Sequence, residues 1–157
     1  MFIFMKKSFR QYMVTAIISF ALMLSGCSAV EQVSQSLDYV NQTTEYIQQV
    51  SNMGTELQRL APEAASSPDA LSQMKESLNQ IQTKANDFAQ LKPPAIGESI
   101  HQQLVQYSNQ LSDTVVSYKN QIEQYGVTAE NWEQTGIPAL IANMNKLQEQ
   151  VNRLGGS

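Results

Sequence analysis

The sequence predicts an all-α fold, an antiparallel up-down bundle of four helices. Apolar residues recur at three- and four-residue steps through four stretches of the chain, and this spacing places them on one face of a helix. Pro62, Pro93-Pro94 and Gly126 divide these stretches into hairpin lengths, and helices joined by short connections pack as antiparallel neighbours. No β-rich alternating run bounded by turn residues is present.

The first predicted helix spans residues 29–60. We expect Pro62 and the Ala-Ala-Ser-Ser run after it to end this helix. Gln35, Gln42, Gln49 and Glu56 recur every seven residues and should form a solvated stripe. The expected core face consists of Val30, Val33, Leu37, Val40, Ile47, Val50, Met53, Leu57 and Leu60, with Thr44 filling one position.

The second helix should begin at Ser67-Pro68-Asp69 and end at Pro93-Pro94. Ser67 can accept a hydrogen bond from a free amide of the first turn, Pro68 suits the first helical position, and Asp69 complements the helix dipole. Residues before a proline are pushed out of the α region, so the helix should stop there.

The third helix is expected over residues 95–125, and the fourth from Ile137 to Leu154. In the third helix one apolar row has sevenfold spacing and ends at Tyr125. Gly126 should adopt a left-handed conformation as the cap, and Thr128 should cap a short helical turn around Trp132. Gly155-Gly156 ends the last helix.

A basic and then apolar segment precedes the predicted bundle. Lys6, Lys7 and Arg10 are followed by an apolar run over residues 13–24, which is shorter than the roughly 20 residues that a membrane-spanning helix needs. This arrangement is typical of a cleaved secretory signal peptide. We therefore divide the chain into a signal peptide, residues 1–26, and a helical domain, residues 27–157.

The last residues of this segment, Leu24-Ser25-Gly26-Cys27, resemble the lipobox of bacterial lipoproteins. The resemblance implies that a signal peptidase recognises Leu24, Ser25 and Gly26, and that the thiol of Cys27 receives a diacylglyceryl group. Two acyl chains anchor a protein stably, whereas one does not. The implied location is the outer leaflet of the cell membrane, with the domain facing away from the cytoplasm. The alternative is an ordinary signal peptide followed by a spare thiol.

Further segments extend the resemblance. The stretch Leu37-Asp38-Tyr39-Val40-Asn41-Gln42-Thr43-Thr44-Glu45-Tyr46, the hinge Leu91-Lys92-Pro93-Pro94 and His101 are similar to a family of small lipoproteins from Gram-positive, Bacillus-like bacteria. That resemblance implies a surface lipoprotein and an all-helical fold. It supplies neither an activity nor a site.

Charge and cysteine content narrow the classes of partner. Residues 27–157 hold seven basic and fourteen acidic residues, a net charge of −7. Such a domain should not bind nucleic acid, nor lie flat on anionic lipid. Cys27 is the sole cysteine, so no intramolecular disulfide can form.

His101 is the one histidine and the one candidate for metal or catalytic chemistry. Glu98 precedes it by three residues, which is half of the Glu-x-x-His arrangement of di-iron bundles, and no second such pair exists. A zinc site would lack further nitrogen or sulfur ligands. The sequence therefore predicts a structural histidine, no metal, no cofactor and no enzymatic activity.

Two classes of function remain open for the domain, which we expect to fold as a monomer. One is a binding or structural module that meets another envelope protein, with Trp132 either plugging the end of the bundle or contacting the partner. The other is a carrier or sensor that holds a small apolar ligand between its helices. Gaps in the core would favour the carrier, but only Thr44, Ala85 and Thr114 are small or polar near the helix seams.

Overall fold

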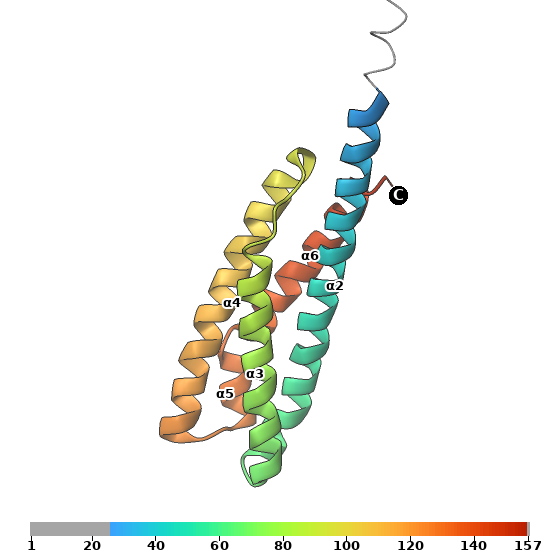
Figure 1. The fold of residues 1–157 in the computed structure, drawn as a ribbon. Helices are drawn as coiled ribbons and strands as arrows, with labels where there is room; N and C mark the ends of the chain where they lie inside the picture. Colours follow the sequence, from blue (N-terminus) through green and yellow to red (C-terminus); the bar gives the residue numbers. More distant parts are fainter. Residues whose placement is uncertain (1–25, 157) are drawn as a thin grey trace, which may run out of the picture. The chain divides into compact units, whose positions relative to one another are not determined.

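The structure is a computed structural model that describes residues 26–156, apart from the side chains of residues 26–33 and Ala129. These residues form helices and no strand: α2 (Gly26–Ala64), α3 (Pro68–Phe88), the 3-10 helix η1 (Ala95–Gly97), α4 (Glu98–Tyr125), α5 (Ala129–Gln134) and α6 (Ile137–Leu154). The chain divides into two units, Met1–Gln35 and Ser36–Ser157, and the helices of the second unit pack around one core (Figure 1). The prediction of an all-α helical bundle is confirmed.

Hydrogen bonds between side chains show how α2 runs beside its neighbours. Tyr39 of α2 pairs with His101 of α4, and Tyr46, seven residues later, pairs with Ser108, also seven residues later. Helices α2 and α4 therefore run parallel. The same step along α2 moves the partner on α6 back by seven, so those helices run antiparallel; the pairs are Thr44 with Asn152 and Ser51 with Asn145.

Helices α3 and α4 form an antiparallel hairpin. A step of seven residues along α3 moves the partner on α4 back by seven; the pairs are Asn79 with Lys119 and Asn86 with Ser112. The connection between these helices includes the two prolines and η1. It lies at the same end of the second unit as the C-terminus of α6 (Figure 1).

Two predicted helix starts are confirmed. The side chain of Ser67 accepts a hydrogen bond from the Ala70 N–H over 3.2 Å, and Pro68 occupies the first turn of α3. The side chain of Thr128 accepts from the Asn131 N–H over 3.0 Å at the start of α5. Both caps satisfy amides that have no partner within the helix.

Two predicted helix ends are wrong. Helix α2 continues through Pro62 to Ala64. The proline removes one donor close to the helix end, while Ala61 and Ala64 remain buried and hold the last turn against the core. Helix α3 ends at Phe88, five residues before Pro93, because Phe88 is the last buried residue of its apolar face and a proline constrains only the residue before it.

The end of α4 also differs from expectation. Gly126 has a positive φ of 78°, as predicted, but its ψ of −172° is extended and not left-handed helical. The chain therefore leaves α4 directly, and Val127 is buried again one residue later. Tyr125, expected on the core face, is 77% exposed because it lies at this exit from the bundle.

Between residues 36 and 46 the buried face of α2 is shifted by one residue toward the N-terminus from the predicted face, although Ile47 is buried as predicted. Tyr39, Thr43 and Tyr46 are buried, whereas Leu37 is 44% exposed and Val40 is half-buried. The tyrosine hydroxyls reach polar partners on α4, so the two rings can be buried without leaving their hydroxyls unpaired. From Val50 to Leu60 the predicted apolar face is buried, apart from the half-buried Met53.

Candidate functional site

The predicted lipidation site lies at the edge of the described residues. Leu24 and Ser25 are outside them, and Gly26 and Cys27 are the first residues of α2, with side chains that are not described. Cleavage of residues 1–26 and lipidation of Cys27 therefore stay predictions. Among the helices that the structure describes, none is both long and apolar enough to cross a membrane.

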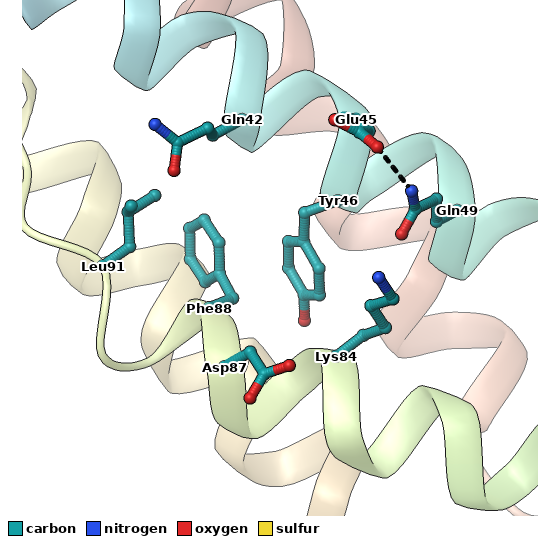
Figure 2. Close-up of a pocket in the computed structure, with 8 residues that line it drawn as sticks. All are labelled: Gln42, Glu45, Tyr46, Gln49, Lys84, Asp87, Phe88 and Leu91. Carbon is teal, nitrogen blue, oxygen red and sulfur yellow. Dashed lines mark hydrogen bonds between the residues drawn. The ribbon is translucent and has the colours of Figure 1, made fainter.

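A groove lies between α2 and α3 in the second unit. We call it the α2–α3 groove. It has a volume of about 230 Å³ and is lined by Gln42, Glu45, Tyr46, Gln49, Lys84, Asp87, Phe88 and Leu91 (Figure 2). Glutamines 42 and 49 belong to the stripe predicted to be solvated. They do lie at the surface or partly so, but they also form one wall of this groove.

Two aromatic rings form the floor of the groove. Tyr46 of α2 and Phe88 of α3 stack with ring centroids 4.4 Å apart and planes within 9° of parallel (Figure 2). Each residue is only about one-twentieth exposed: 6% for Tyr46 and 5% for Phe88. The stack thus joins the two helices and gives the groove an apolar base.

The Tyr46 hydroxyl forms a hydrogen bond with Ser108 of α4. Ser108 Oγ donates its proton to the Leu104 carbonyl over 2.7 Å, so it accepts from the Tyr46 hydroxyl, also at 2.7 Å. Burial raises the pKa of Tyr46 to about 12, and the bond to Ser108 opposes this only in part. The residue is therefore a neutral, fixed part of the floor.

The rim of the groove is polar and carries charges of both signs. Gln49 Nε2 donates to Glu45 Oε1 over 2.7 Å on the α2 side (Figure 2). Lys84 and Asp87 stand on the α3 side. Such a rim offers amide, carboxylate and ammonium groups to a ligand that lies along it.

His101 lies in the core beside the groove floor. It is 7% exposed, its Nδ1 is 3.3 Å from the Tyr39 hydroxyl, and its ring centroid is 5.3 Å from that of Phe88. Burial lowers the pKa of His101, and the nearby Glu98 opposes this effect. Glu98 itself accepts a hydrogen bond from Gln102 over 2.9 Å. Within the described residues no group of three metal-ligating side chains occurs.

Trp132 is buried, with 2% of its surface exposed. Its ring lies against Tyr118, with centroids 6.0 Å apart, and it lines a second hollow of about 200 Å³ between α2 and α6. This placement agrees with a plug at the end of the bundle. A contact between Trp132 and a partner stays a prediction, and it would require the ring to leave its present packing.

Sequence reasoning missed the buried hydroxyls that cross the core. Ser36, Thr43, Ser108 and Ser112 are all buried, whereas Thr44 and Thr114 are half-buried. Among the buried polar atoms, Tyr118 Oη and Trp132 Nε1 have no hydrogen-bond partner in the described part of the chain. A signal was available for Ser108, because it falls four residues after Leu104 on the sevenfold face of α4.

Comparison with known proteins gives the chain a family. Residues 39–154 match the model of a family of unknown function (DUF6376). The chain belongs to this family. It is also 25% identical over 134 residues to the uncharacterized lipoprotein YybP of Bacillus subtilis (strain 168), and the alignment covers 85% of this chain and 90% of that protein. No solved structure matches the chain.

These matches confirm the resemblance to a family of lipoproteins from Bacillus-like bacteria. The match to the family covers the groove residues and His101. Neither description states a ligand or a partner.

Proposed function

We propose that this chain is a lipoprotein anchored through Cys27 in the outer leaflet of the cell membrane, and that its helical domain is a non-catalytic module that binds an envelope protein. The Leu24-Ser25-Gly26-Cys27 sequence and the similarity to an uncharacterized lipoprotein support the anchor. The α2–α3 groove supports the binding role.

The observation that carries the binding role is a polar rim over a fixed aromatic floor. The Tyr46–Phe88 stack and the bond to Ser108 hold the floor in place without a ligand, so a partner need not order it on binding. The rim supplies hydrogen-bonding groups on both walls. A polypeptide segment matches this surface, since it brings backbone donors and acceptors together with an apolar side chain for Phe88 and Leu91.

A carrier of small apolar ligands is the second candidate, and the dimensions of the hollows give it less support. Ligand pockets typically measure about 300–1,000 Å³ and are mostly apolar. The two hollows measure about 230 and 200 Å³, and amide or hydroxyl side chains contribute to both walls. Most inner positions of the helices are filled by apolar side chains, and buried hydroxyls and His101 occupy others.

No catalytic role is included in the proposal. The one histidine of the chain has its Nδ1 against a tyrosine hydroxyl and is buried beside the Phe88 ring. A general base for nucleophilic catalysis would need a serine or cysteine nucleophile within hydrogen-bond reach.

Site-specific photo-crosslinking in cells tests the binding role. We expect a photoreactive amino acid at Gln42, on the groove rim, to crosslink one envelope protein, and the same amino acid at Gln106, an exposed position on α4, to leave it uncrosslinked. Lys84→Glu should lower the yield at Gln42 several-fold because it leaves the rim with three negative charges. Lys146→Glu, on α6, is the matched control. Equal crosslinking from both positions, or equal effects of both charge reversals, would contradict a binding role of the groove.

A further inference from the structure

Two large apolar side chains are exposed at one end of the second unit. Ile96 of η1 is 66% exposed and Leu37 of α2 is 44% exposed. The contacts around two glycines place them at the same end. Gly97, next to Ile96, lies against Tyr39 and Leu154, while Gly155 lies against Leu37 and Val40. We call this end, formed by residues 36–38, 91–98 and 152–156, the η1 end.

The length of chain between the lipid anchor and the η1 end is short. Cys27 precedes Ser36, the first residue of the second unit, by nine residues. Nine residues span at most about 32 Å even when fully extended. Whatever the conformation of this segment, a lipid on Cys27 keeps Ser36, where the chain enters the η1 end, within that distance of the anchoring point.

The opposite end of the unit is farther away. Helix α4 has 28 residues and is therefore about 42 Å long. Tyr125, which is strongly exposed, lies at its far end. The chain from Cys27 enters the second unit at the η1 end, and the far end of α4 is about one helix length farther from that point.

The charge of the η1 end is compatible with lipid. Its side chains carry two negative and two positive charges; the residues are Asp38, Lys92, Glu98 and Arg153. Residues 36–157 as a whole hold thirteen acidic and seven basic residues, a net charge of −6. The excess negative charge thus lies away from the η1 end, and anionic lipid would repel the rest of the domain.

We propose that the η1 end, which exposes Ile96 and Leu37, rests in the interfacial layer of the bilayer to which Cys27 is anchored. This inference depends on the lipidation proposed above. The contact removes two exposed apolar side chains from water and increases the membrane affinity that the acyl chains provide. It holds the α2–α3 groove at one orientation to the membrane. Because the contact is apolar and the end is neutral, it should form on neutral lipid and persist at high salt.

Fluorescence quenching by nitroxide-labelled lipids tests this contact on full-length lipidated protein in phosphatidylcholine vesicles. Cys27 is the sole natural cysteine, so an introduced cysteine is the single free thiol once Cys27 carries lipid. A fluorophore on Ile96→Cys should be quenched strongly by nitroxides near the headgroups. The matched label on Tyr125→Cys, also at an exposed apolar site, should be quenched several-fold less. High salt should leave the difference unchanged.

A second pair of variants tests the role of the Ile96 side chain while the label stays in one place. With the fluorophore on Ala95→Cys, exposed beside Ile96, adding Ile96→Ser should reduce quenching, whereas adding Val116→Ser, on α4, should not. Equal quenching at positions 96 and 125, or no effect of Ile96→Ser, would overturn the inference.

The failure of lipidation has a different signature. An unlipidated protein would lack the mass of the acyl groups and would not float with vesicles. A protein that carries the lipid and floats, but shows no quenching at position 96, would refute the η1 contact alone.

Discussion

Tyr39, Tyr46 and His101 carry the polar contacts that cross the core at one end of the bundle. Burial raises the pKa of Tyr39 and raises that of Tyr46 to about 12, so both phenols stay neutral at physiological pH. His101 is the one of the three whose ordinary pKa lies near neutral pH, and burial lowers that pKa. Its neighbours are the Tyr39 hydroxyl, the Phe88 ring and the carboxylate of Glu98.

Acidification should destabilise the fold through His101. Because burial lowers its pKa in the folded state, the unfolded chain, which titrates near 6.5, takes up the proton first. The contribution of His101 to stability is therefore complete above about pH 6.5 and is lost as the pH falls from there through the folded pKa. We expect urea unfolding midpoints to fall between about pH 7.5 and 5.5 more in the natural protein than in His101→Gln. If the unfolding midpoint fell equally in both proteins, groups other than His101 would cause the loss of stability.

Helices and their caps could be predicted because their signals are local. Ser67-Pro68 and Thr128 act within one turn, and the sevenfold rows of α4 and α6 depend on helix periodicity alone. The buried face of α2 and the ends of α2 and α3 depend on partners distant in the sequence. Tyr39 and Tyr46 point into the core because polar partners for their hydroxyls lie there. These partners are His101 and Ser108, each 62 residues farther along the sequence.

The α2–α3 groove could not be predicted for the same reason. Gln42 and Gln49 form a wall only because α3 places Lys84 and Asp87 opposite them. Along the sequence, the four residues have the spacing of an ordinary solvated surface. Tyr46 and Phe88 stack on each other in the structure. In the sequence, each of them alone has the character of an ordinary core residue.

The crossing of α2 and α6 gives a prediction at the scale of the helices. A Cβ on Gly54 would lie 2.6 Å from Ile141 Cδ1 and 3.9 Å from Cγ1 and Cγ2. Alanine stabilises a helix interior by roughly 0.5–1 kcal/mol relative to glycine, but here Cδ1 must first move. Gly54→Ala should therefore stabilise the fold by about 0.5–1 kcal/mol when Ile141→Val has removed Cδ1, and by less in the natural background.

A double-mutant cycle measures this coupling from chemical unfolding of the two single variants and the double variant. The stability of Ile141→Val itself should fall by roughly 0.5–1.5 kcal/mol. If Gly54→Ala stabilised the fold equally in both backgrounds, the two effects would be additive. That result would contradict the coupling, because it would mean that α2 and α6 can move apart at this point without a cost in free energy.

For the whole molecule, a short chain joins a predicted lipid anchor to a helical domain with a net negative charge. In the proposed arrangement, the anchor would limit the reach of the domain, the negative charge would disfavour broad contact with anionic lipid, and the neutral η1 end would face the bilayer. The α2–α3 groove would then be available to proteins of the envelope. Every part of this arrangement depends on the modification of one residue, Cys27.

Metabolic labelling with an alkyne fatty acid tests that modification most directly. The protein and its Cys27→Ala variant would be expressed in Bacillus subtilis and isolated by a C-terminal tag. We expect the natural protein to take up the label and to fractionate with membranes, and the variant to be unlabelled and released from them. Labelling that persists in Cys27→Ala, or that is absent from the natural protein, would contradict the account of a lipid-anchored helical module.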